Sequence, residues 1–450
     1  MTVRESDAGN KSAEQATDGA PRRSKSRRVS WDVLRAAAIA LVVVQHATWG
    51  GPYLVPELAE RPIFLDLQVG ASILMVISGY FICQTLSSSG PRALLQNRLV
   101  RIIPPMAVAA IASHIIVHLW GPETLQRDFA SLIGTILVYP PGLIEGISRT
   151  DGSYWTIPLQ VTAFLVTALL WPRSWRHGIR LRIALTVAAV FPIVLSLLLE
   201  IPGIGAGALR AIEIATTLGG GRVHLLAGGA ALWLWGTHRS GHWVLLIAAL
   251  APITHLISAH DARGAIALLV AMVAIGAAAR GPDWNHPRLQ VLLRPVVWLA
   301  GISYGIYLVN HNIGYSVMYQ LSEAGVPPMV QSAVMIVCSV TLGWILTRTV
   351  EGPIADRFRY RRKRPASSAP VAETAAAKPP VEAPVASVVA ETTPEPTVEV
   401  TRTAKPGARP APVEPGDAGR TMVPESDAAD WVDAADAHSE VPQTEAGVSR

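Results

Sequence analysis

The chain has 450 residues, of which 50% are hydrophobic and 16% are charged. Soluble domains carry about 25% charged residues, so a deficit of this size over so long a chain argues against soluble domains and for a protein that lies in lipid. The two cysteines, Cys83 and Cys338, both lie within apolar runs, which argues against a disulfide scaffold and against a cysteine-ligated metal.

The net charge of +5 is unevenly distributed along the chain. Residues 365–450 contain 14 acidic and 6 basic residues, a net charge of −8, so residues 1–364 carry +13. The arginines of this basic body stand at the ends of apolar runs, where they determine membrane topology. We therefore expect no nucleic-acid partner.

The chain begins with a polar segment, residues 1–28, which we expect to be disordered. This segment ends in the basic run from Arg22 to Arg28. The apolar run that follows is too long and starts too late for a cleaved secretory signal, so we interpret it as a retained first span.

Ten stretches are long and apolar enough to cross a membrane, which takes about 20 residues. They predict an all-α, polytopic bundle of about ten transmembrane helices within residues 29–356. The stretches are 31–50, 66–87, 101–120, 154–172, 181–199, 222–236, 243–260, 263–279, 295–320 and 328–349. The sixth is short. The apolar stretch 129–147 is expected to be interfacial or re-entrant, because two prolines and a glycine interrupt it.

The distribution of arginine predicts the orientation of these spans. If the basic N-terminal segment lies in the cytoplasm, arginine occurs in every loop on that side, namely 88–100, 173–180, 237–242, 280–294 and the stretch after the last span. This agrees with the positive-inside rule for an even number of spans. The bias toward Ala, Gly, Arg and Pro indicates a bacterial source. We therefore expect an inner-membrane protein with both termini in the cytoplasm.

Residues 357–450 are predicted to be a basic juxtamembrane stretch followed by a disordered cytoplasmic tail. From residue 365 onward the sequence is rich in Pro, Ala, Glu, Val and Thr, with one aromatic, Trp431, so it cannot bury a core. The stretch 426–440 could form a short acidic helix that binds a protein partner, or it could be solvated like the rest.

Ionisable residues within the first span are functional candidates, because burying them in lipid is costly. Asp32 and Arg35 lie three residues apart on one helix face, either as a functional pair or as an interfacial anchor. His46 follows Asp32 by fourteen residues, roughly 21 Å along a helix. A neutral imidazole there can take a proton from an attacking hydroxyl, or it can be a structural histidine bonded between helices.

Two arginines three residues apart, Arg98 and Arg101, follow the second span. Guanidinium groups bind phosphate and pyrophosphate through paired hydrogen bonds, so these residues are candidates for cofactor binding. Positive-inside topology alone would also account for both.

Further polar candidates lie in the fourth and ninth spans. Gln160 lies inside the fourth span and could donate a hydrogen bond to a substrate. The ninth span contains the run Asn310–His311–Asn312, and three consecutive polar residues do not suit exposure to lipid. We expect this run to face a cavity.

One pair of histidines has the spacing of metal ligands. His114 and His118 lie four residues apart in the third span, but neither a carboxylate nor a cysteine nearby in the sequence completes a site. We therefore expect no metal.

Six motifs, in this order, resemble those of acyltransferase family three, bacterial membrane O-acyltransferases that modify envelope polysaccharides, lipids and some macrolides. The motifs are WDVLRAAAIALVVVQH, GASILMVISGYFI with Ser78-Gly79, Arg98-x-x-Arg101, YWTIPLQ, ISYGIYLVNH and Glu351-Gly352-Pro353. The resemblance covers about residues 29–356. Ser72 stands where the family usually has Asp, Gln160 where it has Glu, and Asn310 where it has the ninth-span His. These departures indicate either a divergent subgroup or an inactive member.

The resemblance implies transfer of an acyl group, with acetyl expected, from cytoplasmic acyl-CoA to a hydroxyl of an envelope glycan, a glycolipid or a secreted metabolite. Acyl-CoA is then a co-substrate, and no permanently bound cofactor is expected. The resemblance implies His46 as general base or acyl carrier, Arg98 and Arg101 as ligands of the CoA phosphates, and Gln160, Asn310 or His311 as oxyanion donors. The remaining candidates, for substrate binding, are Asp32, Arg35, Ser78, Trp155, Tyr304 and Tyr307.

Two other functions are compatible with polar residues in the spans. The protein could be a transporter or flippase of an envelope lipid or sugar, or a non-catalytic scaffold whose acidic tail recruits a partner. The sequence shows no internal repeat and no matched pair of broken helices, which argues against a transporter.

Overall fold

The computed structural model describes residues 28–140, 144, 146–174 and 178–363. The predicted basic N-terminal segment up to residue 27 and the tail from residue 364, with its possible helix at 426–440, lie outside the described residues. Residues 28–359 belong to one compact unit, whereas 360–363 belong to a second. The described residues contain helices, turns and loops but no strand, which confirms the all-α prediction.

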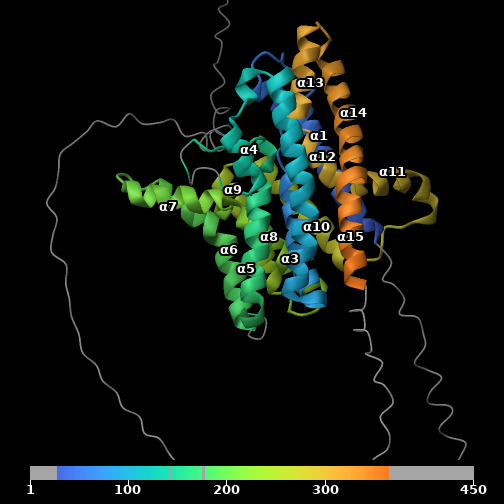
Figure 1. The fold of residues 1–450 in the computed structure, drawn as a ribbon. Coiled ribbons are helices and arrows are strands. Elements are labelled where there is room, and N and C mark those ends of the chain that lie inside the picture. Colours follow the sequence, from blue (N-terminus) through green and yellow to red (C-terminus); the bar gives the residue numbers. More distant parts are fainter. Residues whose placement is uncertain (1–27, 141–143, 145, 175–177, 364–450) are drawn as a thin grey trace, which may run out of the picture. The chain divides into compact units, whose positions relative to one another are not determined.

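Helices cover all ten of the predicted spans (Figure 1). In chain order the α-helices are α1 (Val29–Gln45), α2 (Gly51–Leu54), α3 (Gly70–Trp120), α4 (Phe129–Ile136), α5 (Thr156–Ser174), α6 (Gly178–Leu199), α7 (Ala206–Thr217), α8 (Val223–Gly236), α9 (Val244–Ala259), α10 (Ala262–Arg280), α11 (Gln290–Gly301), α12 (Ser303–Val309), α13 (Asn312–Glu323), α14 (Pro328–Leu346) and α15 (Gly352–Lys363).

The protein is a helical membrane protein. Within the described residues, six helices are long and apolar enough to cross a membrane, or seven if the bent pair α11 and α12 forms one span. The predicted number of about ten is therefore not confirmed. The lower number has a simple origin, because α3 counts once although two predicted spans fall on it, while α8 and α9 have only 14 and 16 residues.

The first limb of α3 runs antiparallel to α1. We call the end of the bundle at which α1 begins the Trp31 end, and the end at which the first span finishes the Gly51 end. The ring of Trp31 lies 4.5 Å from that of Tyr80, centroid to centroid. A Cβ atom on Gly70 would lie 2.7 Å from a methyl carbon of Val42, much further along α1. The limb therefore starts toward the Gly51 end and runs to the Trp31 end.

The second limb of α3 returns to the Gly51 end. The two limbs meet at Gly90, whose φ of 78° is a backbone conformation open to glycine. After this break the carbonyl of Ile102 accepts a hydrogen bond from Tyr304, and at the far end a Cβ on Gly121 would lie 2.7 Å from the hydroxyl oxygen of Ser316. Because Ser316 follows Tyr304 along α12 and α13, this limb runs parallel to them.

Helix α8, which covers the short sixth predicted span, is the most deeply buried helix. Every residue from His224 to Leu234 is buried. Glycines allow its backbone to lie directly against α3: a Cβ on Gly229 would collide with the carbonyl oxygen of Val76, and one on Gly79 with that of Leu226. Such close approach through small residues is the usual way in which helices pack in lipid.

The start of α1 is held by a loop far away in the sequence. The carboxylate of Asp283 accepts hydrogen bonds from the backbone N–H groups of Val29 (3.2 Å) and Ser30 (2.9 Å). These are two of the N–H groups that a helix leaves without an internal partner. Partial burial acts to raise the pKa of Asp283, but the hydrogen bonds outweigh it and hold the pKa below its ordinary value.

The ninth predicted span is not the continuous helix that the sequence suggested. It bends by 54° between α11 and α12, and it breaks again between α12 and α13, at Asn310 and His311. The second break is stabilised because the side chain of Asn310 hydrogen-bonds the carbonyls of Ile306 and Tyr307. Polar side chains thus compensate the interrupted backbone, as interrupted helices inside a membrane require.

Candidate active site

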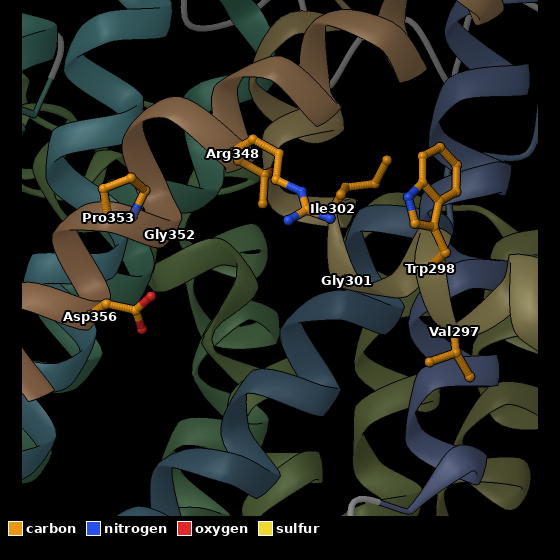
Figure 2. Close-up of a pocket in the computed structure, with 9 residues that line it drawn as sticks. Val297, Trp298, Gly301, Ile302, Arg348, Gly352, Pro353 and Asp356 are labelled. Atoms are coloured by element: carbon orange, nitrogen blue, oxygen red, sulfur yellow. The ribbon is translucent and has the colours of Figure 1, made fainter.

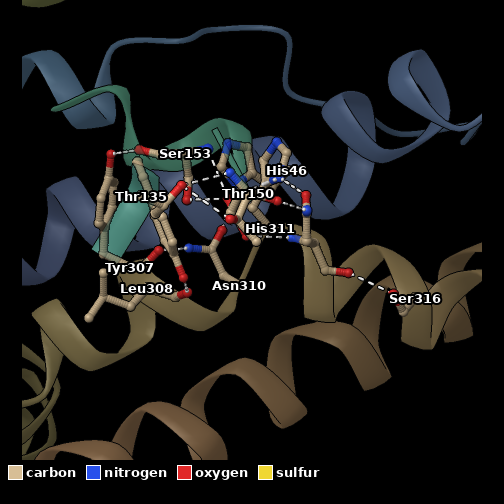
Figure 3. Close-up of polar contacts among 12 residues, drawn as sticks. His46, Thr135, Thr150, Ser153, Tyr307, Leu308, Asn310, His311 and Ser316 are labelled. Carbon is tan, nitrogen blue, oxygen red and sulfur yellow. Dashed lines mark hydrogen bonds and ion pairs between the residues drawn. The ribbon is translucent and has the colours of Figure 1, made fainter. Parts of the chain in front are cut away.

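His46 lies where the first span changes from α-helix to a π-helical turn, His46–Gly50. Such turns are rare and recur at functional sites. The Nδ1 atom of His46 lies 2.5 Å from Oδ1 of Asn310 (Figure 3). The amide nitrogen of Asn310 donates in turn to the carbonyls of Ile306 (3.0 Å) and Tyr307 (2.8 Å).

These contacts determine which nitrogen of His46 carries the proton. The Asn310 amide nitrogen can only donate, and both of its partners are carbonyls, so its oxygen must face His46. An amide oxygen can only accept, so Nδ1 of a neutral His46 must carry the hydrogen. The Nε2 atom is then left with its lone pair. His46 as a residue is only partly buried.

A hydrogen bond from α14 stabilises the π-helical turn. The hydroxyl of Ser332 donates to the carbonyl of Ala47, the residue after His46, at 2.6 Å. Arg61, in the loop after α2, is almost completely buried and donates to Ser332 (3.2 Å) and to Gln331 (2.8 Å). The loop, α14 and the turn that carries His46 are therefore held together.

A second imidazole, that of His311, lies beside the first. The rings of His46 and His311 are 5.0 Å apart and nearly perpendicular. The Nδ1 atom of His311 lies 2.7 Å from Oδ1 of Asn312 and 3.3 Å from Oδ1 of Asp151. The break between α12 and α13 thus brings three predicted polar residues, Asn310, His311 and Asn312, into one buried network.

Asp151 is a member of this network that the sequence analysis missed. It is buried, and its carboxylate accepts from the backbone N–H (2.9 Å) and hydroxyl (2.7 Å) of Ser153 and from the backbone N–H of Asn312 (3.1 Å). One signal in the sequence could have identified it. An Asp two residues before a Ser is typical of a side chain that closes a turn, and this turn directly precedes a span.

Two tyrosines fix the segment that carries Asp151. Tyr307, a predicted substrate-binding residue, donates its hydroxyl hydrogen to the carbonyl of Ser153 (Figure 3). The hydroxyl of Thr156 lies 2.9 Å from the hydroxyl oxygen of Tyr307. The hydroxyl of Tyr154 donates to the carbonyl of Leu308 at 2.8 Å. The turn before α5 is therefore attached to α12 at several points, and the Tyr307 hydroxyl is engaged within the protein.

The four predicted charged residues of the Trp31 end lie together. Arg101 forms an ion pair with Glu351 at 2.7 Å, and Arg35 lies 4.0 Å from the buried carboxylate of Asp32. Arg98 is close enough to Arg35 and Arg101 to be repelled by both. Among the described residues Arg98 has no hydrogen-bond or ion-pair partner.

The other predicted residues occupy different positions. Gln160 and Ser78 are half-buried in α5 and α3, and neither makes a hydrogen bond to the His46 network among the described residues. Trp155 lies at the Gly51 end, where the guanidinium of Arg222 is 5.8 Å from the centre of its ring. Tyr304 donates its hydroxyl hydrogen to the carbonyl of Ile102 at 2.8 Å, near Arg101.

A cavity of about 500 Å³ opens where α11 bends into α12 (Figure 2). Its lining combines apolar groups, among them Trp298 and Ile302, with the charged side chains of Arg348 and Asp356. Thr347 also lines it, and the hydroxyl of Thr347 lies 3.5 Å from Glu351, the partner of Arg101. The cavity therefore adjoins the arginine cluster.

No metal centre accompanies these groups in the described part of the chain. There, no three His, Cys, Asp or Glu side chains lie together in a way that could hold an ion. The rings of His114 and His118 are 4.2 Å apart in α3, and Nδ1 of His118 bonds the carbonyl of His114.

Comparison with known proteins gives one match. A family model described as an acyltransferase domain matches residues 28–348, which include His46, Asp151, Arg98, Arg101 and the break in the ninth span. No curated protein and no solved structure matches the chain.

Proposed function

The chain belongs to the acyltransferase family whose domain model matches residues 28–348, and on this basis we propose that it moves an acyl group from acyl-CoA to a hydroxyl at the opposite face of the membrane. The transferred group is acetyl, and the acceptor is an envelope glycan, a glycolipid or a secreted metabolite. One observation carries the proposal: the contact with Asn310 leaves Nε2 of His46 with its lone pair.

This nitrogen is suited to act as a general base. The acceptor oxygen attacks the thioester carbonyl carbon while His46 Nε2 takes the hydroxyl proton, and the carbonyl electron pair moves onto its oxygen. The intermediate then collapses and the C–S bond breaks. The leaving sulfur takes the proton back from the imidazolium, which yields the ester and the thiol of CoA. General base catalysis of this kind is worth roughly 10²–10⁴-fold.

Asp151 supports the same step through its charge. The reaction makes His46 positive for a moment, and the His311 ring separates His46 from the buried carboxylate of Asp151. A fixed negative charge near a developing cation lowers the barrier, because the interior of a bundle screens charge weakly. Asp151 and His311 therefore act as positioning and electrostatic partners of His46.

Acyl-CoA is the donor that the Trp31 end favours. Three arginines, Arg35, Arg98 and Arg101, lie close together there, and Arg98 has no partner among the described residues. Such a cluster suits the phosphates of CoA, since guanidinium groups bind phosphate oxygens through paired hydrogen bonds. In the orientation predicted by the positive-inside rule, this end faces the cytoplasm.

The acceptor approaches from the Gly51 end. Trp155 follows directly after the turn that holds Asp151 and Ser153, and Arg222 lies over its ring. An aromatic face and a guanidinium suit the apolar face of a sugar ring and an anionic headgroup. Donor and acceptor thus reach His46 from opposite ends of the bundle.

The test compares envelopes from a deletion strain complemented with different variants. Mass spectrometry of lipids and glycans should show loss of one acyl mass in the deletion strain and its return with the wild-type gene. His46→Ala should fail to restore it, with a loss of at least about 10²-fold. The matched control is His118→Ala, because His118 is an exposed histidine of α3 that contacts His114 of the same helix.

Expression and membrane insertion of each variant are measured by immunoblot and by thermal unfolding in detergent. An acyl signal restored by His46→Ala to the wild-type level would rule out this role for His46.

A further inference from the structure

Tyr315 carries a buried hydroxyl group that none of these steps uses. Its side chain is fully buried, and within the described residues its oxygen has no hydrogen-bond partner. Nearly all buried hydroxyl groups in proteins have a partner, because leaving one unsatisfied costs stability. Phenylalanine would fill the same position without this cost. The hydroxyl therefore needs an explanation other than packing.

The Tyr315 side chain lies beside both imidazoles of the site. The ring of Tyr315 lies 4.5 Å from that of His311 and 6.0 Å from that of His46. A Cβ atom on Gly50 would lie 2.7 Å from the Tyr315 oxygen and 3.5 Å from Cδ2 of His46, the carbon bonded to Nε2. The phenol oxygen and the Cδ2 edge of His46 thus both lie beside Gly50, with the amide nitrogen of Gln45 3.6 Å from the same built Cβ position, and glycine at position 50 adds no side chain there.

Two other polar groups of the site are already engaged. The amide nitrogen of Asn310 donates to two backbone carbonyls, and the hydroxyl of Tyr307 donates to the carbonyl of Ser153. The hydroxyl of Tyr315 is free of such contacts among the described residues. An O–H group that is already fixed and desolvated before the reaction is an effective oxyanion donor, since it needs no reorganisation.

We propose that Tyr315 is a catalytic residue whose hydroxyl donates a hydrogen bond to the oxyanion formed when the acceptor attacks the acyl group. The phenol keeps its proton throughout, while the hydroxyl proton of the acceptor goes to His46 and then to the leaving sulfur. The inference rests on the proposed function, because it requires His46 as the base.

The test is the variant Tyr315→Phe, which removes one oxygen atom and nothing else. The purified protein is placed in vesicles with a total envelope extract as acceptor, and release of CoA from acetyl-CoA is followed. We expect kcat to fall by about 10²–10³-fold, as for loss of one oxyanion donor. The KM for acetyl-CoA should not change, and Tm should stay the same or rise, because a buried unsatisfied hydroxyl is lost.

Tyr319→Phe is the matched control. Tyr319 lies one turn further along α13 and is partly buried, and its hydroxyl makes no hydrogen bond to any described residue, so its variant should keep the wild-type kcat. A purely structural role for Tyr315 would lower Tm and reduce activity only in proportion to the folded fraction, which would overturn the proposal.

The role of Tyr315 and the proposed function of the protein can be tested separately. A wild-type kcat in Tyr315→Phe, while His46→Ala is inactive, would overturn the role of Tyr315 and leave the proposed function intact. Equal activity of wild type and His46→Ala would overturn both.

Discussion

At the scale of single residues, Asn310 has the clearest chemical consequence. Its amide is always neutral, and its nitrogen and oxygen have fixed and different roles, so it determines the tautomer of His46 without adding a charge. A histidine at this position, as in the related family pattern, could act as donor or acceptor. With Asn310 in place of that histidine, His46 can still act as a base, because the lone pair on its Nε2 points away from Asn310.

The arginine cluster gives a prediction at the same scale. Arg98→Ala should raise the KM for acyl-CoA about tenfold, as for loss of one charge-assisted hydrogen bond, and leave kcat nearly unchanged. Arg98 is the best position to change because its removal leaves no partner unpaired among the described residues, whereas Arg101→Ala would leave Glu351 without its ion pair.

Arg92→Ala is the control for this measurement, since Arg92 is an exposed arginine on the same limb of α3. Steady-state kinetics with acetyl-CoA compare the KM of Arg98→Ala with those of Arg92→Ala and the wild type. An unchanged KM in Arg98→Ala would mean that this arginine serves topology alone.

At the scale of elements, both helices that form the site are irregular where they meet. The first span changes to a π-helical turn at His46, and the ninth span breaks at Asn310 and His311. Regular helices would present these side chains around a cylinder at 100° intervals. The break instead turns His311 toward Asp151 while Asn310 faces His46, so neighbours in the sequence reach different partners.

The contact between α3 and α8 gives the prediction at this scale. Gly229→Val should destabilise the bundle by about 1–3 kcal/mol or prevent its assembly, because the added carbons would meet the backbone oxygen of Val76, which cannot move aside. Thermal unfolding in detergent and the yield of folded protein measure this effect.

Gly276→Ala is the matched control within a membrane helix. A Cβ at that position would lie 3.5 Å from the ring of Trp235, an ordinary contact, so Tm should hardly change. If Gly229→Val and Gly276→Ala unfolded at the same temperature, the close backbone contact between α3 and α8 would not matter for stability.

At the scale of the whole molecule, the arginine cluster and the His46 network lie at different positions along the helices that they share. The arginine cluster lies at the Trp31 end, and the network around His46 lies toward the Gly51 end of the same helices. Acyl-CoA is too polar to cross a bilayer, so an enzyme that acylates an envelope component must bring the acyl group through the protein. A base placed between the two ends meets this need.

Deletion of residues 365–450 is the prediction for the whole molecule. The family match ends at residue 348 and the described helices end at residue 363, so the truncated protein should insert and keep its turnover. The rate of CoA release by purified full-length and truncated protein in the same vesicles tests this. Loss of turnover with normal insertion would favour a protein whose activity depends on a partner bound by the tail.

The sequence alone determined the class of the molecule and the ends of most helices. Apolar runs separated by arginine-rich loops indicate a helical membrane protein, because lipid leaves the backbone almost no alternative to helices there. The same local logic selected His46, Asn310 and His311 as candidates, since polar groups in apolar runs are costly and stand out. Asp151 stands out less, because its spacing to Ser153 indicates only a turn and nothing local shows that this carboxylate is buried.

Only the tertiary structure decided how these residues meet. The turn before α5 packs against α12 and buries Asp151 beside His311, although the two are far apart in the sequence. The break in the ninth span and the space beside Gly50 likewise depend on side chains from other helices. The spacing of apolar residues and the hydrophobicity of a helix are properties of one segment of the sequence. Whether a buried polar group has a hydrogen-bond partner, and which one, depends on every segment that packs around that group.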